Sequence, residues 1–340
     1  MAKTSRVTLA DIAAETGVSL ATISKVLNGR TDVAAATRAR VEEELSRHGY
    51  QRRASAQGAP YVELVFHELE SSWSMEVIEG VERIAKEAGY SVVLTVSGDR
   101  HSPAPDWIDG VLRRRPVGVV LVFSDISAPY REKLRSRRIP FVIVDPAGDP
   151  SPDVPSVGSA NWSGGLMATR HLIELGHRRI AAITGPEDMM CSLARVDGYR
   201  SAMNSAGLNI DPRWIRFGDF HTSGGESRAA ELLALDEPPT AIFAGSDLQA
   251  LGAIAAARKV GLSVPDDLSV VGYDDIELAR WISPQLTTVH QPLRKMGESA
   301  TRLVLRMAEG HEPDTLRMDL ATRLVVRGST AAPAAVAVAS

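Results

Sequence analysis

Several residues of this sequence stand where an α/β protein would bind a small polar molecule. The apolar stretches TAIFAG and LSVVGY are followed directly by Ser246 and Asp247 and by Asp274 and Asp275. Such stretches are typical of buried parallel strands, whose carboxyl ends line the ligand crevice of open sheets. Carboxylates placed there can accept hydrogen bonds from paired sugar hydroxyls. Asp247 and Asp275 have an alternative role, because one member of each pair can cap the following helix.

Aromatic side chains are placed to contribute to the same site. Phe220 follows the stretch WIRFGD, and Trp73 and Trp162 each come at the start of an expected helix. Their rings can stack on the face of a sugar, or they can pack between two lobes of the protein. His67 and Glu68, just after the stretch YVELVF, are further candidates.

The sequence lacks the usual motifs of catalysis and metal binding. The glycines of NWSGGL and HTSGGES form neither a GxGxxG motif nor a P-loop, and no GxSxG motif occurs. The histidines are scattered, and the lone Cys191 excludes an intramolecular disulfide and a cysteine-rich zinc site. The aspartate pairs would suit a glycosidase, but they also suit binding alone. We therefore expect no metal and no cofactor, and we expect a binding protein rather than an enzyme.

The first 30 residues have the spacing of a DNA-reading unit. Thr8 is placed to cap a first helix that Gly17 ends, and Ser19 is placed to cap a second helix. Apolar residues recur at helical spacing in both, and a third helix follows with Val41 and Leu45 at i and i+4. Two helices joined by a glycine turn form the helix-turn-helix pattern, although an ordinary three-helix cap is the alternative.

The second helix of this unit can enter the major groove of DNA. Leu20 and Ala21 suit thymine methyl groups, and Lys25 suits guanine acceptors. Short polar side chains nearby suit phosphate oxygens. The residues expected to contact DNA are Thr8, Ser19, Leu20, Ala21, Thr22, Ser24, Lys25 and Asn28, with Arg52 and Arg53 from the segment that follows. Residues 1–60 carry nine Lys/Arg against six acidic residues, so this head is basic while the whole chain has a net charge of −4. A basic head fits a polyanion-binding module, although chance also explains this excess.

From residue 61 onward, Val/Ile-rich strands alternate with helical stretches. This pattern predicts parallel sheets covered by helices on both faces. About ten strands are too many for one typical sheet, so two doubly wound lobes are favoured over a single sheet. A (β/α)8 barrel is the rival architecture, but PQLTTVHQPL and TRLVVRG look like strands that cross back between lobes.

The chain resembles the LacI/GalR (lactose-repressor) family of transcriptional regulators across residues 7–329. The head segments TLADIAAETGVSLATISKVLNG and TRARVEEELSRHGY carry the resemblance, as do ARVDGYRSAM and SPQLTTVHQPLRKMG in the body. The resemblance implies a periplasmic-binding-protein-like pair of lobes with a cleft for a sugar-like effector. It also implies that Arg195, in ARVDGY, contacts the ligand.

The segment QRRASAQGAP, residues 51–60, departs from the family pattern. It lacks the Pro-Asn pair that is usual in the family. It also lacks the leucine that family members insert into the minor groove to kink operator DNA. We expect a flexible linker there, in which Arg52 and Arg53 can bind phosphates or enter a narrow minor groove. The tail STAAPAAVAVAS has no leucine heptad, which favours a homodimer that reads an inverted-repeat operator.

Together these patterns predict an α/β protein with a three-helix helix-turn-helix head and two doubly wound parallel α/β lobes. The expected domains are the head at 1–50, the linker at 51–60, the two-lobed body at 61–330 and a flexible tail at 331–340. With no signal peptide and no membrane-spanning run, a cytoplasmic location is expected. The expected function is a repressor of carbohydrate-utilisation genes that responds to a mono- or oligosaccharide. The alternatives are a sugar-acting enzyme with a DNA-binding head and a sugar-transport protein. The residues expected to bind the effector are His67, Trp73, Trp162, Arg195, Phe220, Ser246, Asp247 and Asp274.

Overall fold

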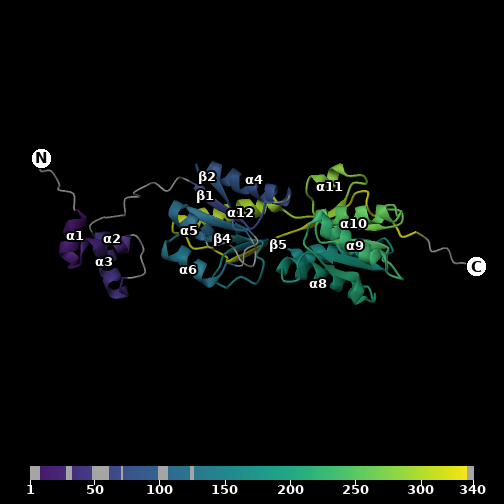
Figure 1. Ribbon diagram of the computed structural model, residues 1–340, viewed down its shortest axis with the longest axis horizontal. Coiled ribbons are helices and arrows are strands. Elements are labelled where there is room, and N and C mark those ends of the chain that lie inside the picture. The colour runs from purple at the N-terminus through teal and green to yellow at the C-terminus, as the bar shows by residue number, and fades with distance from the viewer. Residues whose placement is uncertain are drawn as a thin grey trace, which may run out of the picture.

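The head is a three-helix unit followed by two α/β lobes (Figure 1). The computed structural model describes residues 8–27, 33–47, 61–69, 72–98, 106–122 and 126–334. The head helices are α1 (Leu9–Thr16), α2 (Leu20–Leu27) and α3 (Ala35–Arg47). They pack around Ile12, Ile23 and Val41, the apolar positions that recur at helical spacing in the sequence.

Lobe 1 is built on a parallel sheet with strand order β11-β5-β4-β3-β1-β2. Helices cover both faces of this sheet: α4 and α12 pack on one face, and α5 and α6 pack on the other. The strands are β1 (Tyr61–Phe66), β2 (Ser91–Val96), β3 (Gly118–Val122), β4 (Phe141–Val144), β5 (Ser156–Ser159) and β11 (Arg317–Leu320). The helices are α4 (Ser72–Glu87), α5 (Asp106–Arg114), α6 (Ala128–Ser136) and α12 (Leu293–Ala308).

Lobe 2 repeats this plan with strand order β12-β10-β9-β8-β6-β7. Its strands are parallel except for β12, which runs antiparallel to β10. The strands are β6 (Ile180–Thr184), β7 (Ile215–Phe217), β8 (Ala241–Ala244), β9 (Ser269–Asp274), β10 (Thr287–His290) and β12 (Arg323–Val325). The helices are α7 (Asn161–Glu174), α8 (Met190–Ser205), α9 (Thr222–Leu233), α10 (Asp247–Lys259), α11 (Leu278–Trp281) and the 3-10 helix η1 (Pro212–Trp214).

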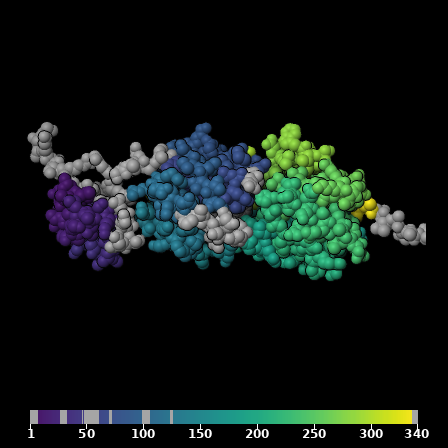
Figure 2. Space-filling model, in the orientation of Figure 1, coloured from purple at the N-terminus to yellow at the C-terminus, as the bar shows by residue number. Residues whose placement is uncertain are grey.

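The chain passes between the lobes at three places, and the two lobes lie side by side (Figure 2). It crosses from β5 to α7, from β10 to α12 and from β11 to β12. The expected two-lobed architecture is confirmed, and two separate sheets replace the rival barrel. The elements α5, α12 and β11 were not singled out from sequence patterns. The helix α12 packs in the core of lobe 1 although it follows β10 of lobe 2 in the chain. The position of α12 is therefore decided by contacts between segments that are distant in the sequence.

Helices α7 and α8 approach each other closely because glycines line the surface between them. A Cβ on Gly165 would lie 2.2 Å from the carbonyl oxygen of Arg195, and one on Gly198 would lie 2.1 Å from that of Trp162. No side chain larger than hydrogen fits at either position without moving a helix. The two glycines therefore set the distance at which α8 presents Arg195.

The substitution Gly165→Ala should push α8 away from α7 and reduce the free energy of unfolding by about 1–3 kcal/mol, as overpacking does. Urea denaturation of the two proteins measures the difference. Gly110→Ala is the matched control, because its new Cβ would meet only the movable guanidinium end of Arg114, at 3.1 Å. Equal stability of G165A and the wild type would show that the packing of α7 on α8 tolerates a methyl group.

The chain after β12 is fastened to lobe 2 by a buried histidine. His177 Nε2 lies 2.9 Å from the carbonyl oxygen of Ala331 and 3.0 Å from Ser269 Oγ, while Nδ1 lies 2.9 Å from Thr240 Oγ1. Because a carbonyl can only accept, Nε2 carries the proton in this hydrogen bond. The expected flexible tail thus follows an ordered attachment that includes Ala331. Burial lowers the pKa of His177 below its usual value.

A lowered histidine pKa makes stability depend on pH in a defined direction. The unfolded chain binds a proton at His177 more readily than the folded chain, so this residue's contribution is complete above about pH 6.5 and is lost at lower pH. The difference in unfolding free energy between wild type and His177→Gln should therefore narrow from pH 7.5 to pH 5.5, by at most about 1.4 kcal/mol. Urea denaturation at both pH values tests this. The same difference in unfolding free energy at both pH values would contradict this prediction.

Candidate nucleic-acid interface and effector site

The turn between α1 and α2 is held by local hydrogen bonds. Thr8 and Asp11 form a capping box, with Thr8 N donating to Asp11 Oδ2 at 2.7 Å and Asp11 N donating to Thr8 Oγ1 at 3.3 Å. Gly17 follows α1 with a left-handed φ of 67°. Ser19 Oγ then accepts from the Thr22 backbone at 3.2 Å, which caps α2. The oxygens of Thr8 and Ser19 are thus engaged in caps.

One face of α2 is free of the head's core. Leu20 is 52% exposed, and Ala21, Ser24 and Lys25 are exposed with it. Ile23 and Val26 on the opposite face are buried. An exposed leucine beside an exposed lysine suits a surface that meets base edges rather than water alone. Of the other expected DNA-binding residues, Asn28, Arg52 and Arg53 lie outside the described residues.

Arg195 is the centre of the candidate effector site. It is 3% exposed, and its Nε donates to Asn161 Oδ1 at 2.9 Å while Nη1 donates to the carbonyl oxygen of Gly245 at 2.5 Å. Its guanidinium carbon lies 3.8 Å from the centre of the Tyr273 ring and 5.4 Å from that of Phe220. Among the described residues Nη2 makes no hydrogen bond, so this nitrogen is available to a ligand.

Two buried carboxyl groups, one from each lobe, act on this guanidinium. Asp145 directly follows β4 in lobe 1, and Asp274 ends β9 in lobe 2. Burial raises the pKa of both carboxyls above the usual aspartate range, and the charge of Arg195 opposes the rise. Asp274 accepts a hydrogen bond from Gln291 at 2.7 Å, and Gln291 in turn accepts one from Ser159 at 2.6 Å.

Four buried polar atoms, on residues near Arg195 or next to its partners, make no hydrogen bond in the described part of the chain. They are Asp145 Oδ2, Thr184 Oγ1, Ser192 Oγ and Gln249 Oε1. Ser192 precedes Arg195 by one turn of α8, and Thr184 lies against Gly245, the acceptor of the Arg195 hydrogen bond. Buried polar groups are nearly always paired, so a group of unpaired ones indicates a place for water or a polar ligand.

The remaining expected strand-end residues have structural partners. Ser246 caps α10 and donates to the carbonyl oxygen of Phe220 at 2.8 Å. Asp247 is buried and accepts from Ile276 N at 2.9 Å and from Thr288 Oγ1 at 2.5 Å. These hydrogen bonds occupy both of its oxygens, which favours a structural role for Asp247.

Asp275 was the other aspartate with an alternative role. It binds Arg327 at 2.5 Å and His290 at 3.2 Å. Burial works against its charge, but these hydrogen bonds prevail and lower its pKa. Asp274 is therefore the member of the pair that stands beside Arg195.

The expected aromatic and histidine candidates are dispersed. Trp73 is 7% exposed and packs in the core of lobe 1, whereas Trp162 is 45% exposed at the start of α7. Phe220 is the aromatic candidate that the structure brings to Arg195. His67 Nε2 lies 3.1 Å from Glu68 Oε1, and that same oxygen lies 3.6 Å from His221 Nε2 of lobe 2.

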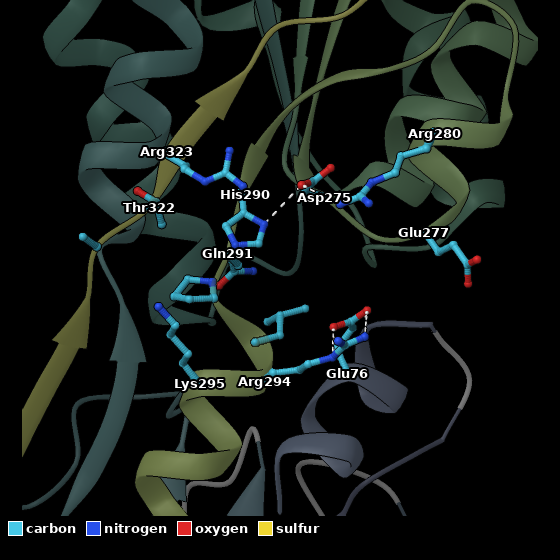
Figure 3. A pocket seen from close by; sticks show the side chains of 13 residues that line it. Glu76, Asp275, Glu277, Arg280, His290, Gln291, Arg294, Lys295, Thr322 and Arg323 are labelled. Atoms are coloured by element: carbon cyan, nitrogen blue, oxygen red, sulfur yellow. Dashed lines mark hydrogen bonds and ion pairs between the residues drawn. The ribbon is translucent and has the colours of Figure 1, made fainter. Parts of the chain in front are cut away.

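A separate cavity of about 680 Å³ opens where the chain crosses between the lobes (Figure 3). Its lining includes His290 and Gln291 from the second crossing and Thr322 and Arg323 from the third. Arg195 and Phe220 do not line it. Gln291 connects the two regions, because it lines this cavity and donates to Asp274.

Four residues of the Arg195 site were not anticipated as ligand-binding residues. Asp145 ends the stretch PFVIVD, so the strand-end signal that indicated Asp274 was also present there. Asn161 opens α7, beside the Trp162 that was considered. Tyr273 and Gln291 gave no signal, because their role depends on the packing of β9 and of the second crossing against α8.

The comparisons with known proteins agree with this architecture. Residues 8–53 match the family described as bacterial regulatory proteins, lacI family, and residues 169–330 match the periplasmic binding protein-like domain. The chain is 32% identical over 331 residues to the HTH-type transcriptional repressor CytR of Escherichia coli (strain K12), covering 96% of each protein. The chain belongs to the lacI family. It is also 32% identical over 328 residues to the repressor PurR of Vibrio atlanticus (strain LGP32), covering 95% of this chain and 98% of that protein.

Solved structures of lacI-family regulators have the same architecture. The CelR–cellobiose complex is 34% identical with a TM-score of 0.73, covering 95% of this chain and 100% of that one. The lac repressor dimer bound to operator and the anti-inducer ONPF is 26% identical with a TM-score of 0.71, covering 96% of this chain and 100% of that one. The expected family and fold class are thereby confirmed, and the protein is a DNA-binding transcriptional repressor with a ligand-binding body.

Three further observations concern metal binding, membrane insertion and catalysis. No group of three or more His, Cys, Asp or Glu side chains in the described part of the chain is arranged to hold a metal ion. No helix among the described residues has the length and apolar character needed to cross a membrane. The relatives named above are repressors rather than enzymes.

The substitution Lys25→Ala should weaken binding to operator DNA more than binding to random DNA. A side chain that reads a base contributes about 1–3 kcal/mol of discrimination, whereas removing a phosphate-binding side chain weakens both equally. Fluorescence anisotropy with the DNA upstream of the protein's own gene and with a shuffled duplex measures the two affinities. Equal weakening on both duplexes would assign Lys25 to the phosphate backbone.

Proposed function

We propose that this lacI-family repressor controls carbohydrate-utilisation genes and senses a hydroxyl-rich small molecule, a mono- or oligosaccharide, at the Arg195 site. The observation that carries the proposal is the free Nη2 of Arg195 between buried carboxyls from both lobes. A ligand with several adjacent hydroxyls can donate to Asp145 and Asp274 and accept from Arg195 at the same time. The cellobiose complex of CelR and the ribose complex of a LacI-family regulator from Enterococcus faecium support this ligand class.

A ligand that touches both lobes can favour one arrangement of them over another. Its effect on DNA binding equals its differential affinity for the two arrangements, typically about 1–3 kcal/mol. We propose that a homodimer reads an inverted-repeat operator in the cytoplasm, since two-fold symmetry in the protein is mirrored in its site. The dimeric lac repressor on its operator supports this assembly.

The proposed division of the chain follows from these roles. The head at 1–50 reads DNA through the exposed face of α2, and residues 51–60 join it to the body. The proposed effector-binding residues are Arg195, Asp274 and Phe220 from the expected set, together with Asp145, Asn161 and Tyr273. Trp162, His67 and Ser246 are left out of the proposed set, since Trp162 is exposed, His67 contacts Glu68, and Ser246 is engaged with the Phe220 carbonyl oxygen. Trp73 and Asp247 serve the packing of their lobes.

The variants Arg195→Ala and Arg195→Lys should keep operator binding but lose at least about tenfold in effector affinity, because a charge-assisted hydrogen bond is worth about 1.5–3 kcal/mol. The measurement is anisotropy of the protein on DNA upstream of its gene, titrated with mono- and disaccharides, nucleosides and hexose phosphates. Arg200→Ala is the matched control, since Arg200 lies on the same helix and, among the described residues, pairs only with the exposed Asp197, at 3.0 Å.

The outcomes separate the parts of the proposal. A response to a sugar that R200A keeps and both Arg195 variants lose supports the site and the ligand class. A response to a nucleoside or phosphate alone would keep the site and overturn the sugar class. A full response in R195A would overturn the site.

Binding rather than turnover is the proposed chemistry of this site. A glycosidase needs one carboxyl placed as acid and another as nucleophile or base across a scissile bond. Here Asp145 and Asp274 flank a permanently charged arginine, which suits the binding of hydroxyl groups. Release of product from any disaccharide that binds would overturn this part of the proposal.

A further inference from the structure

The end of lobe 1 that is nearest the head is strongly basic. Between residues 113 and 138 the sequence carries eight Arg/Lys residues against only two acidic ones, Asp125 and Glu132. Four of the arginines near the ends of α5 and α6 are Arg113, Arg115, Arg137 and Arg138, and we call these four the basic end of lobe 1. The whole chain, by contrast, has a net charge of −4.

The topology places these arginines where the chain enters lobe 1 from the head. In a parallel sheet all strands begin at one edge, and Arg115 and Arg138 shortly precede β3 and β4. Tyr61 begins β1 at the same edge, and its carbonyl oxygen accepts from Val117 N at 3.0 Å. Figure 1 shows α5 and α6 at this end of the lobe, toward the head.

Three cations of these helices form ion pairs within the lobe, among them Arg114 with the buried Glu63. In the described part of the chain, the arginines of the basic end form no ion pair within the lobe. Lys133 pairs with Asp109 at 3.2 Å, and Arg135 pairs with Asp153 at 2.5 Å. Arg113, Arg115 and Arg137 have no acidic partner in the described part of the chain. Among the described residues, Arg138 pairs only with Glu42 of α3, at 3.7 Å. This pair is exposed, so it contributes little to stability.

Two of the four arginines occupy backbone conformations that favour glycine. Arg115 has a φ of 54° and Arg138 has a φ of 55°, and both follow the end of a helix. Glycine is the usual residue there, because a side chain in the left-handed region costs about 1 kcal/mol or more. A cation near a helix C-terminus is favoured by the dipole, but cations inside the last turn of each helix already supply that. The charge at these two positions therefore needs another explanation.

The basic character is confined to one side of this edge. The helices α4 and α12 also end there, on the other face of the sheet, and the cations near their C-terminal ends are paired with acids. Arg83 binds Glu87 at 3.2 Å, and Arg306 binds Asp314 at 3.1 Å. Unpaired positive charge on the α5–α6 side alone fits a single extended anionic partner rather than general solubility.

We propose that the basic end of lobe 1 binds the phosphate backbone of DNA next to the segment that the head reads. The proposal rests on the DNA-binding function of the family and adds a second binding surface to it. Guanidinium groups pair with phosphate oxygens without regard to base sequence. Such pairing would join lobe 1 directly to DNA, in a chain whose residues 51–60 lack the leucine that family members place in the minor groove.

The test compares two variants of the full-length protein with the wild type. R113Q/R137Q removes two unpaired charges. R115G/R138G removes two more and places glycine where φ is positive, so its melting temperature should equal or exceed that of the wild type. The control R170Q/R178Q removes two exposed arginines of lobe 2. The probes are labelled random-sequence duplexes of about 20 and 40 base pairs, the shorter covering little more than two half-sites one helical turn apart.

The wild type and the control should bind the longer duplex more tightly than the shorter one. The increase in affinity should exceed the increase that follows from the larger number of overlapping binding positions on the longer duplex. Both test variants should bind the longer duplex at least about tenfold more weakly at 0.1 M salt. Their plots of log affinity against log salt should be shallower by about 1.8 for each protomer bound, which is 0.9 for each phosphate that the protomer no longer neutralises. Unchanged affinity and slope in both variants would overturn the proposal while leaving DNA binding by the head intact. Equal weakening in R170Q/R178Q would also overturn it, since the effect would then be one of overall charge.

Discussion

The three crossings of the chain between two sheets are the constraint on which the rest of the structure depends. They turn the carboxyl end of β9 in lobe 2 and that of β4 in lobe 1 toward each other, so Asp274 and Asp145 act on one guanidinium. They also carry the hydrogen-bonded chain from Ser159 through Gln291 to Asp274. Any change in the angle between the lobes therefore changes the geometry of the candidate effector site.

The site itself is a buried charge that the protein satisfies only in part. Burying an arginine is costly unless its nitrogens are paired. Arg195 is paired with Asn161 and with the Gly245 carbonyl, lies on the Tyr273 ring, and keeps its positive charge because nearby acidic groups outweigh its desolvation. Arg195 Nη2 and the unpaired oxygens near it determine which hydrogen-bonding groups a ligand must carry. A compound rich in hydroxyl groups satisfies both kinds of group at once.

The head and the basic end of lobe 1 suit a polyanion in different ways. The head exposes short side chains and Leu20 on one face of α2, which suits close approach to base edges. The basic end of lobe 1 carries long arginine side chains, and the described part of the chain gives an acidic partner, Glu42, only to Arg138. Such side chains can reach phosphates at a distance. Because lobe 1 also holds Asp145, binding of this lobe to DNA would connect one carboxyl of the effector site to the nucleic acid through a single lobe.

Much of this protein is determined by local sequence. Helix caps such as Thr8 and Ser19, the turn at Gly17, and the alternation of apolar strands with helices act over a few residues, so the head, the two-lobed plan and the strand-end aspartates could be predicted. Assigning α12 and β11 to lobe 1 could not, because it depends on packing between segments more than 100 residues apart. For the same reason only the tertiary structure decided which carboxylates face Arg195. Asp247 and Asp274 both follow strands at the same edge of the sheet. Thr288 and the Ile276 backbone donate hydrogen bonds to the Asp247 carboxylate, whereas Asp274 lies beside Arg195.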